Sequence, residues 1–113
     1  MATATGRVLT VTDNSFQRQV IEATTPVLVE FGAPWCPPCR AAAPILAQLS
    51  DELAGTRPGA TVDTDEEPRV AADRGVLGLP TFVLFKDGAP VAQCIGFQPK
   101  AKLLDKIRPH LDA

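Results

Sequence analysis

The chain has 113 residues, of which 45% are hydrophobic and 21% charged, and its formal net charge is −2. This length suits one domain with its own core, so we expect residues 1–113 to form a single domain, with residues 1–6 disordered. The mild acidity argues against a nucleic-acid or anionic-membrane partner, either of which requires a basic patch. No apolar run approaches the roughly 20 residues that a membrane span needs, so no membrane association is expected.

The cysteine count and the N-terminal residues bear on the compartment in which the chain works. Three cysteines are an odd number, unlike an extracellular disulfide framework. Residues 1–7 have no charged region leading into an apolar run, so we expect no secretion signal. A reducing compartment, most simply the cytoplasm, is the expected location.

Hydrophobic periodicity and turn residues divide the chain into alternating strands and helices. Strands are predicted at residues 8–12, 27–31, 60–63, 82–85 and 91–95, and helices at 15–23, 41–53, 68–74 and 99–108. Asp87-Gly88 is a strong hairpin signal, so the last two strands should pair antiparallel. The order β-α-β-α-β-α-β-β-α implies an α/β fold, with a mixed five-stranded central sheet flanked by four helices.

Two of the predicted helices carry start and stop signals. Thr12, Asp13 and Asn14 are candidates for the N-cap of the first helix. In the second helix, Pro44 should produce a kink because it removes a backbone hydrogen bond. Gly55 should end that helix, and a loop is expected over residues 56–59.

The second helix follows a strand and begins with two closely spaced cysteines. The run 27–31 is apolar except for Glu30, which is typical of a central strand covered on both faces. Cys36 and Cys39 then flank two prolines, and the regular helix should begin at Pro38 or Cys39. Free N–H groups and the dipole at a helix N-terminus favour a thiolate. The spacing therefore predicts a site for thiol–disulfide exchange.

Other chemistry remains open on these residues alone. Cys36 and Cys39 could join Cys94 and His110 as four zinc ligands. Cys94 is otherwise expected to be a packing residue of the last strand. The acidic residues between 63 and 67 lack the glycine and the ligand spacing of a calcium loop, so we interpret them as a solvated turn.

Several short motifs occur in order along the chain: Trp35-Cys36-Pro37-Pro38-Cys39-Arg40, Pro44-Ile45-Leu46, Val62-Asp63-Thr64-Asp65, Gly78-Leu79-Pro80-Thr81, Phe85-Lys86-Asp87-Gly88 and Gly96. Together they resemble the thioredoxin family over about residues 8–111, with a CPPC variant of the active-site motif. The resemblance implies the thioredoxin fold and the activity of a protein disulfide reductase.

The resemblance also implies roles for individual residues. Cys36 would be the exposed cysteine that attacks a substrate disulfide, and Cys39 would resolve the mixed disulfide. The substrate-binding lip would comprise Trp35, Pro37, Pro38, Leu79, Pro80 and Gly96, joined by Phe97. Pro80 would follow a cis peptide bond. A core position is the alternative for Trp35.

The partners and cofactors follow from the same resemblance. No bound cofactor is implied, because the redox-active Cys36–Cys39 disulfide carries the electrons. An NADPH-dependent flavoenzyme, a thioredoxin reductase, would restore the dithiol, and disulfide-containing proteins would be the substrates. The protein is expected to be a monomer.

At four positions the chain departs from the usual pattern of the family. Glu30 stands where aspartate is usual. Desolvation should raise the pKa of its carboxyl group, which suits a proton relay to Cys39. The alternative is a carboxylate that merely reaches solvent. Thr61 stands where many members carry a lysine, so no positive neighbour lowers that pKa. Gly32 replaces an aromatic residue, and Pro37 replaces a glycine. The redox potential is thereby open, so a disulfide oxidase or isomerase on the same fold is the alternative activity.

Overall fold

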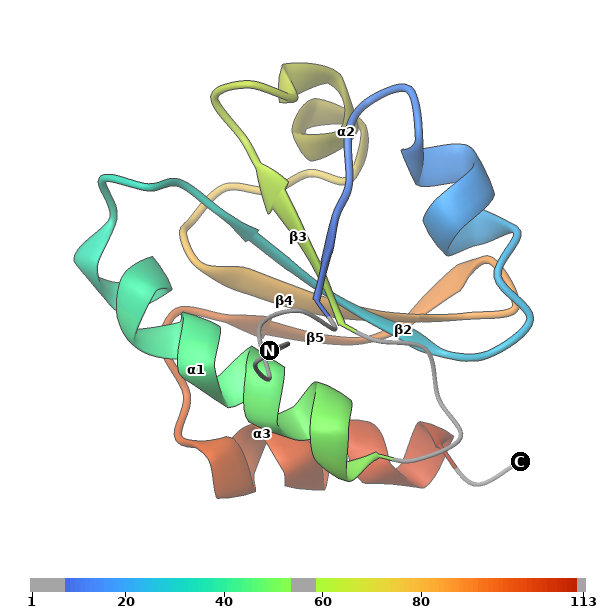
Figure 1. Cartoon of the computed structure of the whole chain (residues 1–113), viewed down its shortest axis with the longest axis vertical. Helices are drawn as coiled ribbons and strands as arrows, with labels where there is room; N and C mark the ends of the chain where they lie inside the picture. The colour runs from blue at the N-terminus through green and yellow to red at the C-terminus, as the bar shows by residue number, and fades with distance from the viewer. Residues whose placement is uncertain (1–7, 54–58, 112–113) are drawn as a thin grey trace, which may run out of the picture.

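The structure of the protein is a computed structural model that describes residues 8–53 and 59–111, and its elements follow the predicted order (Figure 1). The strands are β1 (Leu9–Thr10), β2 (Val27–Gly32), β3 (Ala60–Asp63), β4 (Thr81–Lys86) and β5 (Ala89–Ile95), and the helices are η2 (Gln17–Ile21), α1 (Pro37–Glu52), α2 (Pro68–Asp73), α3 (Lys100–Ile107) and η3 (Arg108–His110). The predicted disorder of residues 1–6, the helix stop at Gly55 and loop residues 56–58 lie outside the described residues.

The described strands form one mixed sheet in the order β1-β3-β2-β4-β5, which confirms the predicted architecture. The central strand, β2, pairs parallel with β3 and antiparallel with β4. β4 and β5 form the predicted hairpin, whose turn residues Asp87 and Gly88 have φ values of 54° and 80°. A type I′ turn requires such positive φ at both central positions. Of the strand predicted at 8–12, Leu9–Thr10 pairs with β3, so β1 is shorter than expected.

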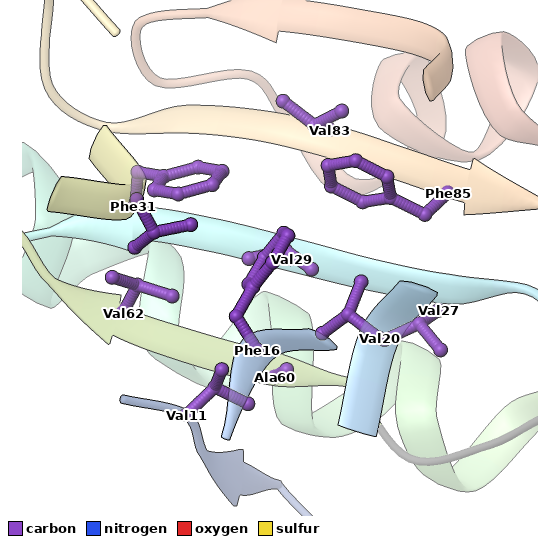
Figure 2. Close-up of a cluster of buried hydrophobic side chains, with 11 residues drawn as sticks. Val11, Phe16, Val20, Val27, Val29, Phe31, Ala60, Val62, Val83 and Phe85 are labelled. Atoms are coloured by element: carbon purple, nitrogen blue, oxygen red, sulfur yellow. The ribbon is translucent and has the colours of Figure 1, made fainter. Parts of the chain in front are cut away.

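Helices cover both faces of the sheet: η2 and α2 lie on one face, and α1 and α3 lie on the other (Figure 1). Side chains alternate along a strand, so β2 contributes to two cores. Val27, Val29 and Phe31 join the core under η2 and α2 (Figure 2), whereas Leu28 joins the core under α1 and α3. By the same alternation, the side chain of Glu30 faces α1.

The helix predicted over residues 15–23 is shorter than expected and has a wider turn. It is a π-helical segment, in which the Glu22 N–H donates to the Gln17 carbonyl five residues earlier, at 2.9 Å. Phe16 and Val20 are nevertheless both buried in the core, as the apolar pattern predicts. The two side chains are therefore buried as predicted, although the backbone hydrogen bonds span five residues and not the four of an α-helix.

The helix α1 begins at Pro37, one residue earlier than predicted. Pro37 and Pro38 occupy its first two positions, where their fixed φ suits a helix and their missing N–H groups need no partner. The helix then continues through Pro44 to Glu52, although proline cannot donate to the carbonyl of Arg40. Among the helices of the described ranges, none is long and apolar enough to span a membrane.

Asp13, one of the cap residues predicted for the first helix, caps α2 instead. Its carboxylate accepts hydrogen bonds from the backbone N–H groups of Val70 (2.8 Å) and Arg69 (3.3 Å). In return, the Glu67 carboxylate accepts from the Asp13 N–H at 2.7 Å. These reciprocal hydrogen bonds join two segments distant in sequence and hold α2 against the turn after β1.

We predict that Asp13→Ala lowers the free energy of unfolding by about 1–2 kcal/mol, because it leaves the first N–H groups of α2 without their cap. Urea denaturation at neutral pH measures this loss. Asp73→Ala is the matched control, since Asp73 is an exposed acidic residue of the same helix, and it should change the value by less than about 0.5 kcal/mol. Equal losses in the two variants would contradict the proposed cap.

Candidate active site

The turn after β2 makes Cys36 the N-cap residue of α1. The Cys36 N–H donates to the Ala33 carbonyl at 3.1 Å, which closes the turn. Because Pro37 and Pro38 have no N–H, the N–H of Cys39 is the first donor that the helix start offers. It points at Cys36 Sγ, at a distance of 3.4 Å. The sulfur thus takes the place that a serine or threonine oxygen usually has in a capped helix.

Both cysteines are free thiols, and both are buried, with exposed fractions of 4% for Cys36 and 5% for Cys39. The prediction that Cys36 is the exposed member of the pair is therefore wrong for this structure, because Ala33 and Leu79 pack against the two cysteines. The thiols differ in hydrogen bonding instead. Cys36 Sγ accepts a hydrogen bond from the backbone N–H of Cys39, and a backbone donor of this kind favours a thiolate.

The pKa of the Cys39 thiol is raised to about 12, chiefly by burial, and then by its hydrogen bond to Cys36 and by the nearby charges of Cys36 and Glu30. A backbone hydrogen bond at Ala33 acts in the opposite direction. Cys39 is therefore protonated at neutral pH. Before it can attack a disulfide as a thiolate, it must lose its proton to a base.

Glu30 lies on β2 and is 4% exposed. Burial raises its pKa from 4.5 to about 7, as predicted. Its register neighbours, Thr61 on β3 and Phe82 on β4, carry no charge, and the Thr61 hydroxyl donates to the carbonyl of Leu9 at 3.5 Å. Within the described residues, no group forms a hydrogen bond with the Glu30 carboxylate. It is a buried base or acid that titrates near neutral pH.

A cavity of about 240 Å³ connects Glu30 with Cys39, and we call it the Gly32 pocket. It lies between β2, β3 and α1, and Gly32 is part of its lining. A Cβ atom at Gly32 would lie 3.1 Å from Cys39 Sγ and 3.4 Å from Glu30 Oε2. The thiol and the carboxylate therefore border the same vacant position. A water molecule there could carry a proton from one to the other.

The predicted lip residues lie on three segments: the turn into α1, the loop before β4 and the residue after β5. The Leu79–Pro80 peptide bond is cis, as predicted, and the Pro80 carbonyl accepts from the Gly96 N–H at 2.7 Å. This hydrogen bond ties the loop before β4 to the end of β5. Trp35 is 63% exposed, and its Nε1 donates to the Asp65 carboxylate at 2.6 Å. Trp35 is thus held at the surface, and its alternative as a core residue is wrong.

Two residues of this region escape the sequence analysis. Asp65 belongs to the acidic turn that the sequence indicates is merely solvated, yet it is the partner of Trp35. Ile95 is 60% exposed and precedes Gly96, close in sequence to Phe97, which is 44% exposed. The position of Ile95 at the end of an edge strand is a signal that could have identified it. No local pattern could have paired Asp65 with Trp35.

The structure does not assemble the ligands of the zinc alternative. Cys94 packs in the core under α3, as expected of a structural residue, and His110 lies in η3. Among the residues described, no three His, Cys, Asp or Glu side chains are grouped so as to hold a metal ion. The sulfur chemistry of this site therefore rests on Cys36 and Cys39.

Two thiols on one helical turn can close into a disulfide and reopen, and a mixed α/β sheet with a cis-proline loop presents them. The fold and the site thus define a thiol–disulfide oxidoreductase.

Comparison with known proteins agrees with this class. A sequence profile of the thioredoxin family matches residues 7–109. Thioredoxin 1 of Nostoc sp. is 40% identical over 89% of this chain and 94% of its own length. The thioredoxin of Alicyclobacillus acidocaldarius is 44% identical over 84% of this chain and 90% of its own. A chloroplastic M-type thioredoxin of Pisum sativum is 42% identical over 96% of this chain and 63% of that protein.

The chain belongs to the thioredoxin family. It is a thiol–disulfide oxidoreductase that reduces protein disulfides by dithiol–disulfide exchange, and such proteins need no bound cofactor.

Glu30→Gln should change how stability depends on pH. Between pH 4.5 and about 7 the folded protein holds a proton on Glu30 that the unfolded chain has lost, so wild-type stability falls as pH rises through this window. The variant lacks this loss, and its free energy of unfolding relative to the wild type should rise by on the order of 2 kcal/mol across the window, allowing for solvent in the Gly32 pocket. Denaturation curves recorded at several pH values measure the difference. Parallel pH profiles for the two proteins would contradict the buried titration of Glu30.

Proposed function

We propose that Cys36 attacks the substrate disulfide and that Cys39 resolves the mixed disulfide. The observation that carries this assignment is the hydrogen bond from the Cys39 backbone N–H to Cys36 Sγ, beside which burial raises the pKa of the Cys39 thiol. The sulfur that accepts this N–H at the start of the helix is the one placed to attack first. The sulfur that keeps its proton is the one that acts second.

The two steps balance as an exchange of sulfur–sulfur bonds. The Cys36 thiolate bonds to one substrate sulfur, and the other substrate sulfur leaves as a thiolate. Cys39 then gives up its proton and attacks Cys36 Sγ, so the first substrate sulfur leaves with its electron pair. The products are a reduced substrate and the Cys36–Cys39 disulfide.

Glu30 is our candidate for the base that takes the proton of Cys39. A group with a pKa of about 7 is efficient at neutral pH, because it can both accept and return a proton. Gly32 leaves room for a water molecule between Cys39 Sγ and Glu30 Oε2. The extra methylene of glutamate, relative to aspartate, is accommodated by this space.

We assign substrate binding to the lip. Its members are Trp35, Pro37, Pro38, Leu79, Pro80 and Gly96. Trp35 and both prolines of the CPPC turn are exposed, so a substrate chain can approach the cysteines over them. The loop at Pro80 can pair with an extended substrate segment through backbone hydrogen bonds, a form of strand addition. Ile95 and Phe97 extend the exposed apolar surface beside Gly96.

The cellular setting follows from the same chemistry. We infer that an NADPH-dependent thioredoxin reductase restores the dithiol and that disulfide-containing proteins are the substrates. The chain would act in the cytoplasm as a monomer of one domain spanning residues 1–113. The family match over residues 7–109 supports the single domain, and an odd number of cysteines, three, suits a reducing compartment.

Cys39→Ser should trap a mixed disulfide on Cys36 when the reduced variant meets a disulfide-containing peptide. Resolution within one helical turn is intramolecular, so the adduct should persist at least about 100-fold longer than in the wild type. Mass spectrometry of the acid-quenched reaction measures the adduct and locates it.

Cys94→Ser serves as the control, because Cys94 lies outside the site, and this variant should accumulate no adduct beyond the wild-type level. If Cys36→Ser traps the peptide on Cys39 as efficiently as Cys39→Ser traps it on Cys36, the assigned roles are wrong.

A further inference from the structure

The Gly32 pocket reaches the active-site sulfurs by a route that the lip does not use. Cys39 lines the pocket, but neither Cys36 nor Trp35, Leu79, Pro80 or Gly96 does. Of the two active-site cysteines, a molecule in the pocket therefore contacts only Cys39. Thiol–disulfide exchange begins with attack on one sulfur of a disulfide, and Cys39 is the sulfur that borders the pocket.

The floor of the pocket contains a polar group that the protein leaves without a partner. Glu30 is 4% exposed and contributes its carboxylate to the lining. No hydrogen bond to this carboxylate is found within the described residues, although buried carboxyl groups are ordinarily hydrogen-bonded. An occupant that brings a proton donor would satisfy it. A thiol S–H is such a donor.

The size and the mouth of the pocket limit the occupant to a small molecule. Its volume of about 240 Å³ exceeds the roughly 150 Å³ of a cavity that holds benzene. Its rim includes Pro34, Arg40 and Ala43, all of which are exposed, so the pocket opens to solvent. A molecule the size of an amino acid fits this volume, whereas a folded polypeptide does not.

We propose that the Gly32 pocket is a second entrance to the active site, through which a low-molecular-weight thiol reduces the Cys36–Cys39 disulfide by attacking Cys39. The proposal rests on the proposed function in one respect, namely that catalysis leaves this disulfide. It adds a reductant of a different class from a flavoenzyme, and a different point of attack from that of protein substrates.

The reaction balances with two molecules of thiol. The first gives its proton to the Glu30 carboxylate, and its sulfur bonds to Cys39 Sγ while the bond to Cys36 breaks and Cys36 leaves as a thiolate. The second thiol attacks the sulfur of the first, releases it as a small disulfide and frees Cys39. Cys39 recovers a proton from Glu30, and Cys36 takes the proton of the second thiol. The protein disulfide is reduced, and the two thiols are oxidised to one disulfide.

Reduction of the oxidised protein by two thiols of different size tests the proposal. The small thiol is 2-mercaptoethanol, and the large one is a ten-residue peptide with a single cysteine. Ala43→Phe places a bulky side chain at the mouth of the pocket, and Ala41→Phe is the matched control, since Ala41 is exposed on α1 but does not line the pocket. Loss of the protein disulfide is followed by acid quench, alkylation and mass spectrometry.

We expect Ala43→Phe to lower the ratio of the small-thiol rate to the peptide rate by about tenfold or more relative to Ala41→Phe. An unchanged ratio would overturn the second entrance. If the peptide thiol fails to reduce even the wild type, the proposed route through Cys36 fails instead, so the two failures are distinguishable.

A second measurement uses the unaltered protein and does not depend on how the variants fold. The first adduct of 2-mercaptoethanol, trapped by acid within the dead time of mixing and mapped by peptide mass spectrometry, should lie on Cys39. An adduct found mainly on Cys36 would show that small thiols use the lip, and it would overturn the proposal.

Discussion

The hydrogen bond from the Cys39 N–H to Cys36 Sγ fixes the position of the two active-site cysteines relative to each other. Cys36 is the N-cap residue of α1 and Cys39 its third residue, and the two prolines between them offer no N–H of their own. The sulfur of Cys36 caps the helix, and the sulfur of Cys39 is a buried, protonated thiol in the first turn of the same helix. The central strand completes the arrangement by placing Glu30 on the face that α1 covers. The first turn of α1 thus positions the groups that carry the chemistry.

Much of this arrangement is predictable from local patterns. The order of the elements, the hairpin at Asp87-Gly88 and the buried carboxylate at Glu30 each depend on a few neighbouring residues, and all are found as expected. The cis bond before Pro80 is also found, although only the resemblance to a family predicts it.

The features that sequence patterns do not predict are contacts between distant segments. Asp13 is predicted as a candidate cap of the first helix, but the helix that it caps lies far along the chain. Asp65 becomes the partner of Trp35 only when β3 is placed beside β2. The burial of Cys36 depends on Leu79, which the loop before β4 brings over the cysteine pair. Packing of this kind leaves no periodic signal for a sequence to show.

Gly32 connects the family pattern with what is particular to this chain. A side chain at this position would fill the space next to Cys39 Sγ and Glu30 Oε2. Its absence leaves the carboxylate facing a cavity, with no hydrogen-bond partner among the described residues and no positive charge on its register neighbours. We propose that the same vacancy admits both a water molecule that relays a proton and a small thiol that acts as a reductant. Both proposals place an occupant beside the same sulfur, that of Cys39.

We propose that the buried carboxylate of Glu30 accepts the proton of Cys39 when the mixed disulfide is resolved. The most direct test is the pH dependence of that single step, measured by rapid mixing with a preformed mixed disulfide on Cys36. The wild-type rate should rise with pH through about 7 and then level off, since the carboxylate must be ionised to act as the base. Glu30→Gln should be slower by about 100-fold and lack this inflection, and Glu30→Asp should restore it in part. Identical rate profiles for the wild type and Glu30→Gln would contradict the account.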